Sequence, residues 1–282
     1  MLYNQRILHG DNGTLRELSR ELNDLAAQTV VVDLATSVDY LYVGSDLPFN
    51  HRFVQVSVAN SVAGTLSVDI WDGTAWVPAV EVIDGTSNSS GVPFAQSGVL
   101  SWTLDRNSHW GKEDTTENMT GSGLTTRKIY GMYWARITVS ASMSASTALA
   151  YIGHRFADDN LMTVTYPDLM RSEVLTAFAA GKTSWNDQHL LAAEEILTDL
   201  RQRKILWSAN QVLAWEQFQF AATHKCAEIV YRAFHGQYEE QRAAAVKSYQ
   251  KAITQGVFVV DRNENGRVEQ RERRPAGVIF RT

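Results

Sequence analysis

The stretch TLSVDIWDGTAW, residues 65–76, decides how the first half of the chain folds. Apolar and polar side chains alternate along its first half, which is the pattern of a strand that buries one face. Asp72 and Gly73 then supply a pair of turn residues, and a second apolar run begins at Trp76. This order predicts an antiparallel hairpin in which Trp71 and Trp76 flank the turn.

Seven further segments between residues 29 and 156 have the same character. They are short, rich in β-branched and aromatic residues, and bounded by Gly, Asn, Asp or Ser. They are TVVVDL (29–34), DYLYVG (39–44), RFVQVSVAN (52–60), AWVPAVEVID (75–84), GVLSWTL (98–104), KIYGMYWARITVS (128–140) and TALAYIGHR (147–155). About eight strands without a helical pattern between them predict an antiparallel β-sandwich domain over residues 29–157.

A short amphipathic helix is expected ahead of the sandwich, in an N-terminal segment of residues 1–28. The stretch TLRELSRELNDLAA (14–27) places Leu15, Leu18, Leu22 and Leu25 on one helical stripe. Thr14 and Glu17 have the spacing of a capping box.

Four helical patterns follow the sandwich. They are YPDLMRSEVLTAFAAG (166–181), NDQHLLAAEEILTDLRQRKI (186–205), ANQVLAWEQFQFAATHKCAEIVYRAF (209–234) and YEEQRAAAVKSYQKAITQG (238–256). Pro167 suits a helix start, and Gly181 and Gly256 suit helix ends. These patterns predict a four-helix bundle within a second domain, residues 158–282. The expected fold class is therefore α+β, with two domains.

Two strand-like runs, VFVVDRN and RVEQRER, come after the fourth helix. Asn265 and Gly266 separate them and are the preferred pair for a tight hairpin turn. The chain is therefore expected to close with a β-hairpin and an extended tail.

The same region offers a weaker alternative, a calcium loop. In DRNENGRVEQRE (261–272), Asp261, Asn263, Asn265 and Glu272 occupy positions 1, 3, 5 and 12 of the EF-hand pattern. An EF-hand needs a helix on each side of its loop, whereas strand-like residues precede this stretch and Arg-Arg-Pro follows it. The hairpin is preferred, and no metal or other cofactor is expected.

Composition narrows the class of protein. The net charge is −5 and the chain has 44% hydrophobic residues, which is typical of a folded protein without a phosphate-binding surface. The single Cys226 excludes an intramolecular disulfide. There is no signal-like start and no run of about 18 apolar residues, so synthesis in the cytoplasm without membrane insertion is expected.

Catalytic motifs are absent from the sequence. No H-E-x-x-H, C-x-x-C, G-x-S-x-G or phosphate-binding loop is present. His224 and Cys226 are two residues apart on an expected helix, so their side chains point in different directions and suit packing better than catalysis. The protein is not expected to be an enzyme.

Tryptophans in the sandwich raise the question of a glycan site. Trp71 and Trp134 lie on alternating strands and are expected in the core. Trp76 and Trp110 lie near turns and are expected to be exposed, where rings can stack on sugars.

The helical half carries a resemblance to a known family. The stretch YPDLMRSEVLTAFAAGKTSWNDQHLLAAEEILTDLRQRK (166–204) resembles the start of head–tail adaptor proteins of tailed bacteriophages. The order of an early helix, a helix with an AAEEI..DLR pattern, a long helix and a terminal extended segment matches over residues 160–282. The sandwich departs from the minimal family and resembles the outward β-domains of phage neck and tail proteins.

The resemblance implies a structural virion protein at the head–tail junction. It implies a ring of twelve subunits that contacts the portal protein and the next neck or tail protein, with double-stranded DNA passing through the bore without sequence-specific contact. Charged residues are the expected interface: Glu195, Asp199, Arg201, Arg203, Lys204, Arg271, Arg273, Arg274 and Arg281. The alternative function is a phage tail or baseplate protein whose sandwich binds glycan through Trp76 and Trp110.

Overall fold

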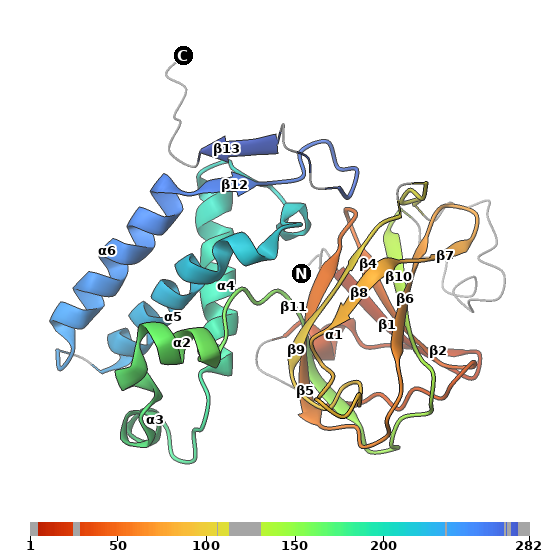
Figure 1. Ribbon diagram of the computed structural model, residues 1–282, viewed down its shortest axis with the longest axis horizontal. Coiled ribbons are helices and arrows are strands. Elements are labelled where there is room, and N and C mark those ends of the chain that lie inside the picture. The colour runs from red at the N-terminus through yellow and green to blue at the C-terminus, as the bar shows by residue number, and fades with distance from the viewer. Residues whose placement is uncertain are drawn as a thin grey trace. The chain divides into compact units, whose positions relative to one another are not determined.

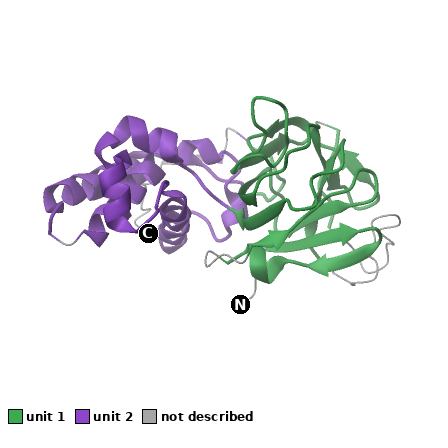
Figure 2. Cartoon of the chain, turned by 90° about the horizontal axis from the view of Figure 1, so that it is seen from below, with its two compact units in different colours: residues 1–153, 263–267 green, residues 154–262, 268–282 purple. Residues whose placement is uncertain are grey.

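The structure, a computed structural model, describes residues 5–24, 29–105, 107–112, 131–234, 236–267, 269 and 272–275. The chain divides into two units (Figure 2). The first comprises residues 1–153 together with 263–267, and the second comprises residues 154–262 together with 268–282. The fold class is α+β, as predicted, with antiparallel sheets in the first unit and helices in the second.

The first unit contains two antiparallel sheets (Figure 1). Their elements are β1 (Gln5–Asp11), β2 (Thr14–Glu17), α1 (Ser19–Leu22), β3 (Val30–Val31), β4 (Tyr40–Ser45), β5 (His51–Val58), β6 (Leu66–Trp71), β7 (Trp76–Pro78), β8 (Val80–Asp84), β9 (Gly98–Thr103), β10 (Tyr133–Val139) and β11 (Ala148–Gly153). One sheet has the order β2-β1-β4-β10-β6-β7 and the other β3-β11-β5-β9-β8. The sandwich therefore has more strands than the eight expected.

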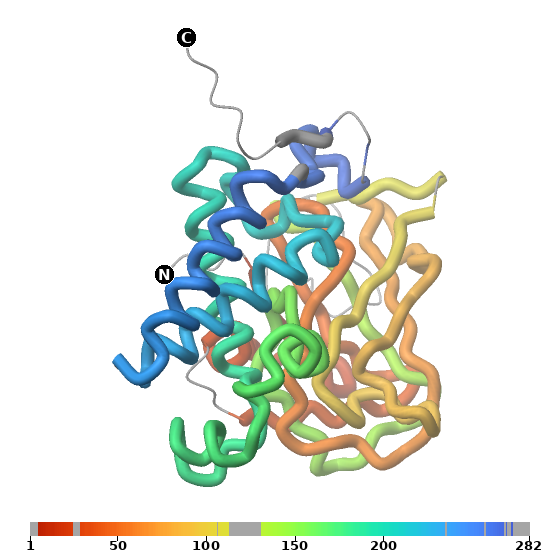
Figure 3. The backbone as a smooth tube through the Cα atoms, turned by 60° about the vertical axis from the view of Figure 1, so that its left-hand side comes forward, coloured from red at the N-terminus to blue at the C-terminus, as the bar shows by residue number. Residues whose placement is uncertain are grey.

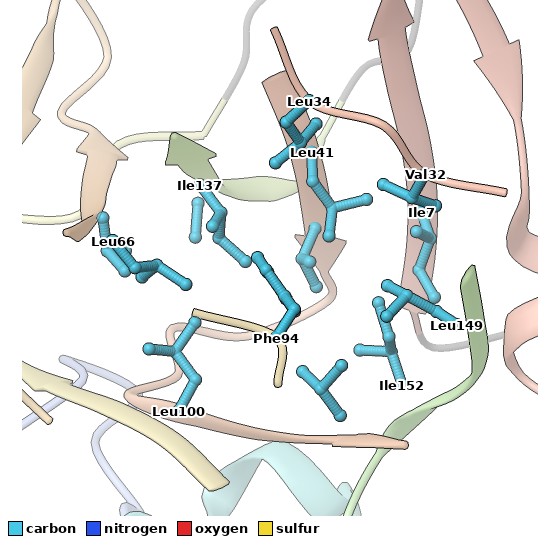
Figure 4. Close-up of a cluster of buried hydrophobic side chains, with 14 of the residues drawn as sticks. Ile7, Val32, Leu34, Leu41, Leu66, Phe94, Leu100, Ile137, Leu149 and Ile152 are labelled. Carbon is cyan, nitrogen blue, oxygen red and sulfur yellow. The ribbon is translucent and has the colours of Figure 1, made fainter. Parts of the chain in front are cut away.

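The core of this unit lies between the two sheets. Figure 4 shows buried side chains of the first sheet (Ile7, Leu41, Leu66, Ile137) and of the second (Leu100, Leu149, Ile152) in one cluster. Alternation along each strand places these residues on the inner face. Each such side chain contributes roughly 1.5–3 kcal/mol when it leaves water, so this cluster is the main stabilising feature of the sandwich.

The hairpin predicted from residues 65–76 is confirmed. Trp71 pairs with Trp76 across β6 and β7. Asp72 Oδ1 accepts the backbone N–H groups of Thr74 and Ala75, each at 2.7 Å. Gly73 has a φ of +103°, a conformation that glycine adopts without strain. The turn residues thus act as their types predict.

The N-terminal helix prediction is wrong for most of its length. β1 and β2 form a hairpin in which Asp11 pairs with Thr14, and α1 is the only helix within the described residues 5–24. Asn12 and Gly13 connect the strands with φ values of 43° and 84°. Positive φ at both central residues is the geometry for which an Asn-Gly pair is favoured. This turn signal outweighs the leucine spacing, and β1 and β2 therefore belong to the sandwich.

The second unit is mainly helical. Its elements are α2 (Asp159–Thr165), η2 (Pro167–Met170), α3 (Ser172–Phe178), α4 (Asn186–Gln202), η3 (Ala209–Gln211), η4 (Trp215–Phe218), α5 (Gln219–Ala233), α6 (Glu239–Gln255), β12 (Val257–Val259) and β13 (Arg273–Pro275), where η marks a 3₁₀ helix. Helix α5 packs against both α4 and α6 (Figure 3). The buried side chains of Ile196, Phe218 and Tyr249 belong to one hydrophobic cluster of the second unit.

The long helix predicted over residues 209–234 is interrupted. Ser208 and Gln211 form a capping box around the short η3, and α5 begins only at Gln219. The Gln211 side chain also donates to the carbonyl of Asp261 at 3.0 Å. Because Gln211 is held by groups distant in sequence, tertiary contacts override the local helical pattern here.

The terminal hairpin exists, but its predicted tight turn is wrong. β12 and β13 pair antiparallel from Val257 opposite Pro275 to Val259 opposite Arg273. Residues 260–272 therefore form a long connection. Val260 is buried in the helical core and the Asp261 N–H donates to the carbonyl of Gln211, so the chain leaves the sheet well before Asn265.

A buried histidine makes the first unit sensitive to acid. His51 lies at the start of β5 and is 1% exposed, and its Nδ1 is 3.0 Å from Asn50 Oδ1. Burial, and secondarily the neighbouring Arg52 charge, lower the pKa of His51 to about 3. Burial also lowers the pKa of His9.

We expect the first unit to lose stability between pH 7 and pH 5. The folded-state pKa of His51 is depressed, so the unfolded chain takes up a proton as the pH falls below its ordinary value and the folded chain does not. The expected loss is roughly 2 kcal/mol at pH 5, from about 1.4 kcal/mol per pH unit. Urea unfolding at both pH values measures it. His51→Gln should flatten the dependence and the exposed His109→Gln should not; equal slopes in both variants would contradict the assignment.

Candidate functional site

The charged residues predicted on α4 separate into two groups. Glu195 forms ion pairs with Lys225 at 2.8 Å and Arg232 at 3.0 Å, both on α5. Asp199 accepts a hydrogen bond from the hydroxyl of Tyr249 on α6. The two acidic members are therefore engaged within the helical unit.

Lys225 is the centre of this internal network. Its Nζ lies 2.8 Å from Glu195 and 2.8 Å from Glu228, and 4.8 Å from the ring centre of Tyr249. Burial by itself would lower the pKa of Lys225, but the two carboxylates raise it above its ordinary value. Burial likewise opposes ionisation of Glu195, whereas Lys225 and Arg232 hold the pKa of Glu195 below its usual value. The network joins α4 and α5 and is structural.

The basic members lie in the last turn of α4 and directly after it. Arg201 and Lys204 line an open pocket of about 590 Å³, together with Ile205, Leu206, Trp207, Gln211 and Arg262. We call this the basic pocket. Its lining holds three cations and no carboxylate among the described residues, and Trp207 is 56% exposed. Arg203 lies beside it and contacts Gln250 at 3.4 Å.

The end of α4 positions the pocket. Lys204 has a φ of +57°, its N–H donates to the carbonyl of Arg201, and the N–H of Ile205 donates to that of Leu200. These bonds are those of a Schellman motif, whose left-handed position usually carries glycine. Cations here also interact favourably with the negative end of the helix dipole.

Arg262 reaches the pocket from the C-terminal part of the chain. The Gln211 side chain bonds to the Asp261 carbonyl and accepts the Trp207 N–H at 2.8 Å. The Arg262 N–H donates to Glu272 Oε1 at 2.9 Å. The sequence prediction missed Trp207 and Arg262; the apolar Ile-Leu-Trp run directly after the cations was the available signal.

Trp110, one of the two tryptophans predicted to be exposed and to stack on glycan, is buried. It is 9% exposed, and its ring centre lies 5.2 Å from that of Phe49 and 6.2 Å from that of Tyr133. A Cβ on Gly266 would lie 2.7 Å from Trp110, so the segment Asn263–Arg267 lies against this ring. A position near a turn therefore does not leave Trp110 exposed, and its predicted exposure is wrong.

Trp76 is partly buried in an aromatic layer on the outer face of the first sheet. Its ring centre is 5.8 Å from that of Tyr42 and 5.5 Å from that of Trp71, and the Arg136 guanidinium lies 4.8 Å above it. Trp71 and Trp134 are 2% and 0% exposed and so are buried as predicted, but they belong to this outer layer and not to the core between the sheets. Trp76 is therefore less exposed than predicted, and its contacts with Tyr42, Trp71 and Arg136 stabilise this layer.

The candidate calcium loop has some features of an EF-hand loop, but it lacks the flanking helices of an EF-hand. Asp261 and Glu272 are buried, and Gly266 has the positive φ that position 6 requires. Strands β12 and β13, instead of helices, flank the loop. Asn263 and Asn265 accept backbone N–H groups of the loop itself. Within the part of the chain that the structure describes, no three His, Cys, Asp or Glu side chains converge as metal ligands.

His189, His224 and Cys226 in the second unit serve packing. His189 is fully buried, with Nε2 3.1 Å from Asp159 Oδ1, and burial lowers its pKa. Cys226 is fully buried, and burial raises the pKa of its thiol. The His224 ring bonds the hydroxyl of Tyr166 at 2.8 Å. His189 and Cys226 do not reach solvent, so neither meets a dissolved substrate.

The other predicted interface residues lie at the C-terminal end. Arg273 and Arg274 belong to β13 and pair with Val259 and Phe258. Arg271 and Arg281 lie outside the described residues. Among the helices that the structure describes, none is both long and apolar enough to cross a bilayer.

Comparison with known proteins assigns no relative. No family model matches the chain, and no similar protein was found among the curated proteins or the solved structures. The function is therefore argued from the residues and their geometry.

Proposed function

We propose that this protein is a structural subunit of the neck of a tailed bacteriophage. It forms an adaptor ring between the portal and the tail, as the resemblance over residues 160–282 implies. The observation that carries the proposal is the basic pocket. The helix with the AAEEILTDLRQRK pattern ends in it, and its three cations have no ion pair within 4.0 Å among the described residues.

Cations that have no ion pair within the described part of the chain, beside an exposed tryptophan, support a role in assembly. Arg and Trp are enriched at the energetic centres of protein interfaces. The helical unit also exposes Val164 (82%) and Phe220 (66%). Charged and apolar side chains left open on one unit are typical of a subunit whose neighbours cover them.

The proposal includes the arrangement of the two domains. The helices form a four-helix adaptor bundle, and the β-sandwich is the outward domain. Twelve copies close a ring by heterologous contacts, in which one face of a subunit meets a different face of the next. A net charge of −5 suits a bore through which duplex DNA slides without being held.

Imaging with the portal tests this function. In negative stain, the chain mixed with portal rings should add a ring of density to one face of each portal. Portal rings that remain bare at excess adaptor would contradict the proposal.

A further inference from the structure

We propose that the basic pocket binds an acidic peptide segment of another virion protein. The segment presents carboxylates to Arg201, Lys204 and Arg262 and rests an apolar side chain against Trp207. The identity of the partner as a virion protein rests on the proposed function, but the chemistry of the pocket does not.

Charge determines the first half of the recognition. The three cations come from the last turn of α4, from the second residue beyond it and from a distant loop, yet they converge on one pocket. Arg201 also acts on Glu194 at longer range: burial raises the pKa of Glu194, and Arg201 lowers it. A ligand with clustered carboxylates supplies the opposite charge that the lining lacks, and guanidinium groups bind carboxylates through paired hydrogen bonds.

Shape and polarity determine the second half. Trp207 is 56% exposed and its backbone N–H is bound by Gln211, so an anchored segment presents the apolar ring at the pocket. Ile205 and Leu206 add aliphatic lining. A side chain such as leucine or phenylalanine gains from leaving water on this surface.

Duplex DNA is less suited to the same pocket. Binding to its backbone is dominated by phosphate contacts and draws on extended basic surfaces, and this chain carries a net charge of −5. Phosphates make no use of the apolar lining. The pocket holds about 590 Å³, which suits a few side chains of a peptide.

Fluorescence anisotropy with the full chain tests the inference. The probe is a fluorescein-labelled peptide, Glu-Glu-Leu-Phe-Glu-Glu, and its matched control is Gln-Gln-Leu-Phe-Gln-Gln. The acidic peptide should bind and the amide peptide should bind at least about tenfold more weakly, because a tenfold change needs only ~1.4 kcal/mol. Arg201→Glu with Lys204→Glu should weaken the acidic peptide by a further factor of at least about ten, and Trp207→Ala by about tenfold.

A matched charge reversal controls for net charge. Lys247→Glu with Lys251→Glu changes two exposed lysines of α6 and should leave the affinity within about twofold. Far-UV circular dichroism confirms that each variant is folded.

Three results would overturn the inference. One is no binding of the acidic peptide, or equal loss in both double variants. Another is a short DNA duplex that binds the wild type and loses affinity only on reversal at Arg201 and Lys204. The third is self-association of the chain that the same reversal abolishes.

The peptide and portal experiments fail separately. If the peptide binds but portal rings stay bare, the proposed function fails and the pocket assignment stands. If portal rings gain density but the peptide does not bind, the pocket assignment fails and the proposed function stands.

Discussion

Replacing Lys225 by methionine is expected to destabilise the helical unit by about 3 kcal/mol. The change leaves Glu195 and Glu228 close together without the ammonium group that bridges them at 2.8 Å. Removing one member of a buried ion pair typically costs about 3–5 kcal/mol, because the remaining charge is left without compensation. The lower end applies, since Arg232 still reaches Glu195 and the Glu195 side chain is 29% exposed.

Urea unfolding followed by far-UV circular dichroism measures this loss, because most helix lies in the second unit. Lys247→Met, an exposed change on α6, is the control and should stay within about 0.5 kcal/mol. Adding Glu228→Gln to Lys225→Met should restore part of the stability. Equal losses for the two lysine variants would show that Lys225 does not hold the network.

The second large effect is expected at Gly44 in the sandwich. A Cβ at this position would lie 2.6–2.9 Å from the indole ring of Trp134 on the neighbouring strand. Trp134 is 0% exposed and therefore has little room to move. Overpacking of this kind costs about 1–3 kcal/mol, so Gly44→Ala should destabilise the first unit by ~2 kcal/mol, although alanine is otherwise preferred to glycine in strands.

Gly10→Ala is the matched control, since it lies on the adjacent strand of the same sheet. Its Cβ would meet its nearest neighbour, Tyr42, at 3.1 Å, and a smaller loss is expected. Combining Gly44→Ala with Trp134→Phe should cost less than the sum of the two single changes. Hydrogen exchange of β4 and β10 peptides reports on this unit alone; an additive double variant would argue against direct contact.

Much of the strand content was predictable because it depends on local chemistry. The Asp-Gly turn after Trp71 and the alternation before it concern neighbouring residues, and each predicted sandwich segment contains a strand. The failure at residues 14–27 was also local. Asn12 and Gly13 are a stronger hairpin signal than a leucine spacing is a helix signal, and the prediction did not weigh them.

Other features depend on contacts between distant residues. The break before α5 follows from Gln211, which bonds to Asp261. The burial of Trp110 involves Gly266, far along the chain. Neither contact can be predicted from the local sequence pattern, because each joins residues that are far apart in the sequence.

The basic pocket likewise combines residues that the local sequence predicts with residues that only the fold brings together. Arg201 and Lys204 were predicted as interface residues from the charge at the end of one helix. Arg262 joins them only because the chain folds back after α6. Trp207 lines the pocket because α4 ends at Gln202 and the chain then turns. The two acidic residues that were predicted at the interface, Glu195 and Asp199, have partners on α5 and α6. Periodicity alone does not identify these partners.

The central claim is that identical copies of this chain stand side by side on a portal ring. Native mass spectrometry of the chain with portal measures it most directly, because the mass counts the subunits in each complex. We expect one dominant complex in which a closed ring of adaptor subunits, twelve by the resemblance, is bound to the portal. A chain that stays monomeric and leaves the portal at its own mass, under conditions where both are folded, would contradict the account.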